Sequence, residues 1–252
     1  MKLLIAMSLF LAAAAVLSYS GERAVSADLP RLSPGEFVAS VLLAAARPIA
    51  VAVLWSKTTD LREERDYDHL LALYQTILKL EPTFAPAWEH FVYDMTIDLP
   101  FRETDPEKQF AWAKKGILLG YQGVAKTPHS SRVAGQVAWT FMYYKVRYPR
   151  LARRVETDRE LNPERLDMYR LALKYAKVAS PRRHRTLFPE WTADLAWRRL
   201  LEETERPEEK RRLAREALDF WREVVTRTRF VDEARKTIKE WHRRLADLGG
   251  GE

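Results

Sequence analysis

The sequence contains no cysteine, and only nine of its 252 residues are glycine. Without cysteine the chain can form no disulfide, no thiolate metal site and no cysteine nucleophile. The scarcity of glycine argues against a turn-rich all-β fold. A glycine-rich phosphate loop, a paired metal-ligand motif and a nucleophile elbow are also missing. We therefore expect no cofactor, no metal site and no catalytic residue, and the chain is not predicted to be an enzyme.

Apolar residues make up 47% of the chain and charged residues 31%, which is enough to bury a sizeable core. The eight Trp, ten Tyr and ten Phe suit large side chains packed between helices. Apolar residues recur at helical spacing along most of the chain. Together these features predict an all-α fold.

Basic residues are concentrated in the second half of the chain. Residues 1–126 carry 13 Lys or Arg and 15 Asp or Glu, whereas residues 127–252 carry 29 and 20. Such asymmetry suits contact with an anionic lipid surface or an acidic partner. Acidic residues are interleaved with the basic ones, however, as they are on a solvated helix face.

The first 20 residues have the layout of an export signal, with Lys2 followed by a nearly unbroken apolar run to Leu17. Cleavage after Ser20 or after Ala27 fits the preference for small residues. The run is somewhat short for a membrane span, so a removed signal peptide and an uncleaved anchor both stay open. Either one predicts that the chain is exported and is inner-membrane anchored or periplasmic.

A second apolar stretch covers residues 37–55. A membrane span would place Arg47 near the bilayer centre, at a cost of about 2.5–3.5 kcal/mol, and Pro48 would interrupt its helix. We therefore favour a buried pair of short helices, the first starting near Pro34 and the second near Pro48. A membrane-embedded hairpin is the alternative.

A helical pattern over residues 67–80 ends at Pro82, and Trp88 follows six residues later near the start of the next helix. An aromatic residue eight positions before a proline and a tryptophan six after it resemble the tetratricopeptide repeat, a 34-residue pair of antiparallel helices. The resemblance places one unit at 51–84, with a turn at Arg65-Asp66. Thr58 and Arg65 depart from the small residue and the turn glycine of the family.

A second closing proline, Pro128, lies 46 residues after Pro82, so the middle unit is about twelve residues longer than the repeat. We assign the excess to a loop at 99–105 and to the segment 120–126. Asp105-Pro106-Glu107 predicts a helix start between them. Beyond residue 150 the repeat signal fades, but helices are predicted from Asn162 to Val178 and over 188–203, 207–226 and 231–248.

The predicted organisation is a signal or anchor at 1–20, a linker at 21–32, repeats stacked as a short superhelix at 33–150, a basic helical region at 151–248 and a tail at 249–252. The spacing of Leu54-Trp55, Pro82 with Trp88, and Pro128 with Trp139 also resembles a group of bacterial envelope proteins with divergent tetratricopeptide-like helices. This resemblance implies an exported scaffold for protein–protein interaction and supplies no catalytic residue.

In tetratricopeptide units the first helix of each pair lines a concave groove that binds partner peptides. By this resemblance the groove candidates are Trp55, Thr59, Arg62, Glu89, Tyr93, Trp139 and Tyr143. The alternative function is an accessory subunit of a membrane enzyme or transport complex, which contacts lipid or an acidic subunit through a basic surface at Arg150, Arg153, Arg154, Arg182, Arg183 and Arg185. Nucleic acid is not expected as a partner, because no aromatic residues are interleaved with these clusters.

An unrecognised enzyme is a third and weaker hypothesis. Asp94 and Asp98 lie four residues apart, as an acid–base pair on one helix face would, and His90 lies four residues before Asp94. Such pairs are common on solvated helices, and no second ligand motif supports a metal site.

Overall fold

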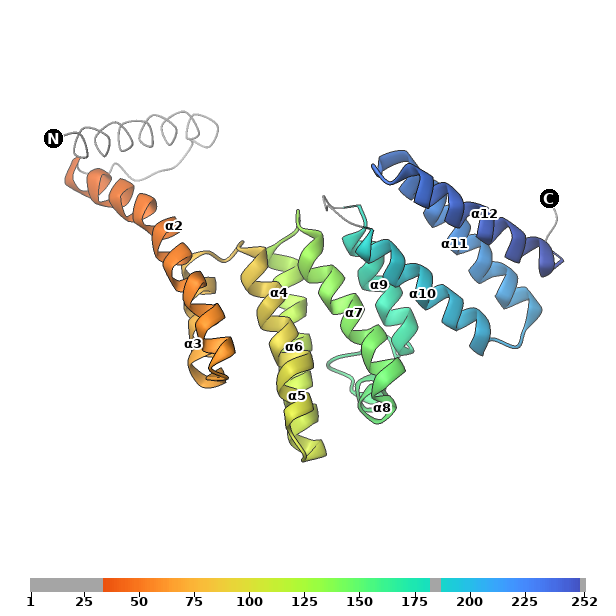
Figure 1. Ribbon diagram of the computed structural model, residues 1–252, viewed down its shortest axis with the longest axis horizontal. Coiled ribbons are helices and arrows are strands. Elements are labelled where there is room, and N and C mark those ends of the chain that lie inside the picture. Colours follow the sequence, from red (N-terminus) through yellow and green to blue (C-terminus); the bar gives the residue numbers. More distant parts are fainter. Residues whose placement is uncertain (1–33, 182–186, 250–252) are drawn as a thin grey trace. The chain divides into compact units, whose positions relative to one another are not determined.

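The computed structural model describes residues 34–181 and 187–249, and the elements in these two ranges are all helices (Figure 1). The predicted all-α class is therefore confirmed for this part of the chain. The chain divides into two compact units, Met1–Pro82 and Thr83–Glu252, and each is described by itself. The predicted signal or anchor at 1–20 and the predicted linker at 21–32 lie outside the described residues.

The first unit contains α2, Pro34–Glu63, and α3, Tyr67–Leu80. The predicted helix start at Pro34 is confirmed, but the predicted break at Pro48 is wrong, because α2 continues through this residue. Proline removes one backbone N–H and crowds the carbonyl four residues earlier, which costs about 3 kcal/mol in a helix interior. The Ala-, Leu- and Val-rich turns on both sides keep the helix continuous.

Residues 37–55 do not form the predicted buried pair of short helices. Arg47, Pro48 and Ile49 are exposed, and 64% of the Ile49 surface is accessible to solvent. Val51 is the one buried residue of the stretch 46–55. In the part of the chain that the structure describes, no helix combines the length and the apolar content that a membrane crossing requires.

The turn between α2 and α3 matches the turn predicted at Arg65-Asp66. Arg65 has a φ of 62°, in the left-handed region, and the Asp66 side chain caps α3 by accepting from the His69 backbone N–H. The two helices pack through Tyr74, whose ring centre lies 6.3 Å from that of Trp55. Nη2 of Arg62 donates to the Tyr74 hydroxyl at 2.6 Å.

The second unit opens with α4, Ala85–Tyr93, a π turn η1, Asp94–Asp98, and α5, Leu99–Arg102. The helix start near Ala85 is confirmed, but the loop predicted at 99–105 is partly wrong, because α5 extends the helix to Arg102. A π turn inserts a residue and displaces backbone carbonyls from their usual partners. Here the Tyr144 hydroxyl donates to the Thr96 carbonyl at 2.5 Å, and Thr96 Oγ1 donates to the Val92 carbonyl at 2.7 Å.

The next helix, α6, spans Pro106–Lys126, and Asp105 caps it by accepting from the Glu107 backbone N–H at 2.8 Å, as predicted. The segment 120–126, predicted to hold part of the excess residues of the middle unit, forms the last turns of α6. Its glycines allow close packing. A Cβ at Gly116 would lie 2.6 Å from Thr96 Cγ2, and one at Gly123 would lie 2.9 Å from the Trp88 ring. α6 therefore packs tightly against α4 and η1.

Helix α7, Ser131–Arg147, is followed by the short α8, Pro149–Thr157, and by α9, Met168–Ala179. The predicted helix start at Asn162 is wrong. Asn162 is buried in the loop before α9, where its Nδ2 donates to the carbonyls of Glu156 and Leu166 and its Oδ1 accepts from the Leu166 N–H. Asp167 caps α9 instead.

The last three helices are α10, Phe188–Glu203, α11, Pro207–Arg227, and α12, Val231–Asp247, close to the predicted ranges. Asp194 on α10 joins all three. Its Oδ1 accepts from the indole N–H of Trp221 at 3.0 Å and of Trp241 at 2.6 Å, and its Oδ2 pairs with Arg198 Nε at 2.6 Å. Both rings are fully buried.

The helices of the second unit pack in a regular order (Figure 1). α6 packs on α7, α9 on α10 and α11 on α12, and the pairs α4–α6, α7–α9 and α10–α11 also pack together. In addition, α7 contacts both α4 and α10 and lies between them. The helices α4, α7 and α10 therefore form one row of neighbours. The predicted boundary at residue 150 lies within this unit.

Candidate functional site

A continuous row of aromatic rings crosses the second unit from α10 to α5. In order, its ring centres lie 5.7, 6.3, 5.7 and 3.7 Å apart along the path Phe188, Trp139, Tyr143, Tyr148 and Phe101. We call these five residues the aromatic row. The first three distances lie in the range of about 4.5–7 Å that is typical of attractive ring contacts, and Tyr148 and Phe101 stack more closely.

Large apolar side chains that reach solvent lie on α7 and α10, which carry part of this row, and on α4, which packs on α7. In the described part of the second unit, the exposed large apolar residues are Tyr93 on α4 at 39%, Val146 on α7 at 49%, and Phe188 and Trp191 on α10 at 40% and 57%. All of them lie on the three neighbouring helices α4, α7 and α10. We call the surface formed by these residues and the aromatic row the open face.

The residues of α7 that belong to the open face, or lie in line with it, follow a helical pattern. Arg132, Gln136, Trp139, Tyr143 and Val146 follow one another at steps of three or four residues and so share one helix face. The opposite side of α7 is buried, with fully packed residues that include Val133, Ala134, Phe141 and Tyr144. Helix α7 is thus anchored by one face and presents the other.

Polar groups on the open face differ in how well they are satisfied. Arg132 on α7 forms an ion pair with Glu89 on α4. Gln136 is 8% exposed, and its buried Nε2 has no hydrogen-bond partner among the described residues. Burial and a hydrogen bond with Tyr143 raise the pKa of the Tyr148 hydroxyl above its ordinary value. Tyr143 and Tyr148 are thus joined by a hydrogen bond as well as by their ring contact.

The structure brings together four of the seven groove candidates. Trp139 and Tyr143 belong to the aromatic row, Tyr93 lies on the open face, and Glu89 is connected to it through Arg132. The other three candidates belong to the first unit. There Trp55 and Arg62 contact Tyr74, and Thr59 is exposed.

The proposed basic surface is only partly free for a ligand. Arg150 and Arg153 are exposed on α8, whereas Arg154 forms an ion pair with Glu107 and lies over the Phe110 ring at 4.1 Å. Arg154 therefore joins α8 to α6. Arg182, Arg183 and Arg185 lie outside the described residues.

Sequence reasoning missed Phe101, Tyr148 and Phe188 and placed Trp191 in a series of mostly buried tryptophans. Phe101 falls in the segment predicted as a loop, and Tyr148 is the residue between α7 and α8. The available signal for Phe188 and Trp191 was their three-residue spacing at the start of a predicted helix. That spacing indicates a shared face but does not say whether it is buried.

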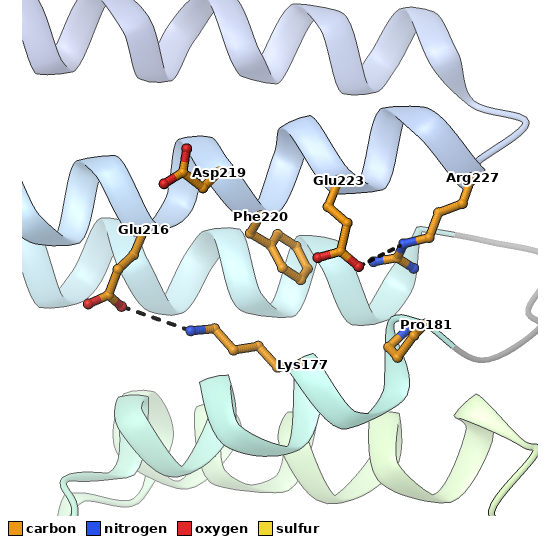
Figure 2. Close-up of a pocket in the computed structure, with 7 residues that line it drawn as sticks. All are labelled: Lys177, Pro181, Glu216, Asp219, Phe220, Glu223 and Arg227. Carbon is orange, nitrogen blue, oxygen red and sulfur yellow. Dashed lines mark ion pairs between the residues drawn. The ribbon is translucent and has the colours of Figure 1, made fainter.

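A hollow of about 400 Å³ lies between α9 and α11. Figure 2 shows its lining, in which Lys177 pairs with Glu216 at 3.9 Å and Arg227 pairs with Glu223 at 3.6 Å. Arg227 also donates through Nη2 to Ser180 Oγ at 2.8 Å and contacts the buried Glu190. The basic groups of this hollow are therefore occupied by contacts within the fold.

The two aspartates considered as an acid–base pair lie in η1. Asp94 is fully buried, and Asp98 is half-buried and pairs with Arg102 at 3.6 Å, so they do not lie together on a solvated helix face. Within the described ranges, no three His, Asp or Glu side chains are grouped as a metal site requires.

Comparison of the chain with protein-family models, with curated proteins and with solved structures gives no match. The function must therefore be argued from the residues of the open face.

Proposed function

We propose that this chain is an exported or membrane-anchored helical-repeat scaffold that binds another protein of the cell envelope through the open face. The observation that carries the proposal is the gathering of Tyr93, Val146, Phe188 and Trp191 on the three neighbouring helices. Contiguous exposed apolar surface on a folded protein marks an interaction site. Tyrosine and tryptophan are also the residues that most often dominate binding energy.

The order of helix packing supports a tetratricopeptide-like arrangement. In such a stack the first helix of each pair packs on the first helix of the next pair, and these helices line the groove. The contacts α4–α7 and α7–α10 follow that rule, and the open face lies on the same three helices. Export is proposed from the amino-terminal sequence, with its single lysine and apolar run.

Photocrosslinking in cells of the source organism tests this proposal. A benzophenone amino acid at position 146 would lie on the open face, and one at position 239 would lie on α12, where Lys239 is exposed. We expect a discrete crosslinked envelope protein from position 146 and none from position 239. Equal crosslinking at the two positions, or none at either in a folded and exported chain, would contradict the proposal.

The second candidate function is an accessory subunit that rests on lipid or on an acidic subunit through the basic carboxy-terminal half. Arg211 and Arg215 on α11 favour it, because neither has a carboxylate partner among the described residues. Their charge should hold the chain in a salt-dependent way. Retention in the membrane fraction that falls with salt and is lost in R211E/R215E would support this function.

A further inference from the structure

The two ends of α7 differ in charge. Near its start, Arg132 is neutralised by Glu89. Near its end, Arg147 is exposed, and Arg150 and Arg153 are exposed on α8 just beyond. In the described part of the chain none of these three has a carboxylate within ion-pair distance.

These three arginines adjoin one end of the aromatic row. Arg147 lies four residues after Tyr143 on α7, about one helical turn further along the open side. Arg150 follows two residues after Tyr148, whose ring stacks on Phe101 at 3.7 Å. By contrast, Arg154 is held by Glu107 and Phe110 and faces α6. The uncompensated charge is thus at one end of the row.

We infer that the partner of the open face is an acidic peptide segment, in which apolar side chains lie over the aromatic row and carboxylates reach Arg147 and Arg150. This inference rests on the proposed function and names the chemistry of its partner. Guanidinium groups bind carboxylates through paired, charge-assisted hydrogen bonds. Because the opposite end is already neutralised by Glu89, the charge also sets the direction in which the segment lies.

A directional chain fits this surface better than a membrane does. An anionic membrane presents the same charge everywhere, so it favours cations spread around an apolar surface. Here the uncompensated arginines stand at one end, and a carboxylate, that of Glu89, lies at the other. A membrane surface is therefore an outcome of the test and not the inference.

The test is selection of displayed random peptides on the purified full-length chain. We expect the enriched peptides to combine apolar residues with Asp or Glu clustered toward one end. In the charge-reversal variant R147E/R150E the enriched charge should change sign to Lys or Arg. The matched control R235E/R243E reverses two exposed arginines on α12, away from the row, and should keep the acidic preference, which weakens as salt is added. Circular dichroism of each variant verifies that the helices are retained.

Three outcomes would overturn the inference. Peptides without an acidic excess would do so, as would an acidic preference that survives in R147E/R150E. The third outcome is that no peptide is enriched. This result would overturn the inference whether or not the chain binds vesicles of phosphatidylglycerol and phosphatidylethanolamine, which test the membrane surface as the alternative ligand. If crosslinking at position 146 still captures an envelope protein, the proposed function stands and only the acidic chemistry falls. Absence of that crosslink counts against the proposed function itself.

Discussion

The tryptophans of the second unit are used in two different ways. Trp221 and Trp241 are fully buried, and both indole N–H groups donate to Asp194. Trp191 is 57% exposed, and the half-buried Trp139 contacts the neighbouring rings of Tyr143 and Phe188. The first pair joins three helices, whereas the second pair lies on the open face.

This difference separates structural rings from rings available for binding. A buried indole contributes apolar burial and also needs an acceptor for its N–H, which Asp194 provides. An exposed ring is still hydrated, so the free energy gained by burying it is released only when a partner covers it. The comparison predicts that interior changes reduce stability and that changes on the open face reduce binding.

The largest effect is expected for Trp241→Ala. The change removes a fully buried ring from between α10 and α12 and leaves a cavity that the helices cannot fill. Loss of a buried tryptophan costs about 3–5 kcal/mol. We expect a loss of this size in the free energy of unfolding, measured by urea denaturation with circular dichroism. A loss below about 1 kcal/mol, which is typical of a surface site, would contradict the assignment of Trp241 to the interior.

Asp194→Ala should have the next largest effect. It removes the common acceptor of two indoles and the ion pair with Arg198, so three donors lose their partner at once. Breaking such a buried network costs about 2–4 kcal/mol. Asp219→Ala on α11 is the matched control, because Asp219 is exposed and pairs only with Arg222 within its own helix. If both variants unfold at the same urea concentration, Asp194 does not join the helices.

Acid should destabilise the chain through two ion pairs. Hydrogen bonds from Arg198 hold the pKa of Glu240 below its ordinary value. Burial alone would raise the pKa of Asp158, but Lys114 and the N–H groups of Leu161 and Glu160 outweigh it and lower the pKa. Because each carboxyl binds its proton more weakly in the folded state, the stabilisation is present above about pH 4.5 and is lost as the pH falls below it.

Each of these pairs should make only a small contribution to stability, because both are partly exposed to water. Lys114→Met removes the ammonium that pairs with Asp158. The variant should therefore lose less stability than the parent chain when the pH falls from about 5 to about 3. Carboxyl groups, whose ordinary pKa values are about 4, take up their protons in this range. Thermal unfolding at several pH values measures this, and identical acid profiles would exclude a contribution from the pair.

The smallest effect, and one of opposite sign, is expected for Gln136→Leu. The change replaces a nearly buried amide, whose Nε2 lacks a partner in the described part of the chain, by an apolar group of similar size. Removing an unsatisfied buried donor is neutral or stabilising, here by up to about 1 kcal/mol. An increase in the melting temperature together with weaker partner binding would mark Gln136 as a residue kept for the open face. A clear decrease in the melting temperature would show that the amide is satisfied in solution.

The helices over 67–80, 188–203, 207–226 and 231–248 were predictable because their signals are local. Proline in the first turn marks the starts of the helices at 188–203 and 207–226, and apolar residues at helical spacing define all four within a short window. The predictions at Pro48 and Asn162 were wrong because they relied on local signals alone. Proline usually ends a helix and Asn-Pro-Glu usually starts one, but the long α2 overrides the first rule and the loop contacts of Asn162 override the second.

The candidate site was predictable in part. Trp139 and Tyr143 were identified through the resemblance to the tetratricopeptide repeat, and their four-residue spacing is consistent with one shared helix face. The contributions of Phe101 and Phe188 depend on which helices become neighbours, and no pattern within α7 carries that information. Nor does the sequence distinguish Trp191 from Trp197, six residues apart on α10, although the first is exposed and the second is fully buried.

The most direct test of the central claim is the affinity of the crosslinked envelope partner for Trp191→Ala. The account predicts a loss of about tenfold or more in affinity, as for a hot-spot residue, with a free energy of unfolding within about 0.5 kcal/mol of the parent chain. Unchanged affinity in a chain of unchanged stability would contradict the claim that the open face binds the partner.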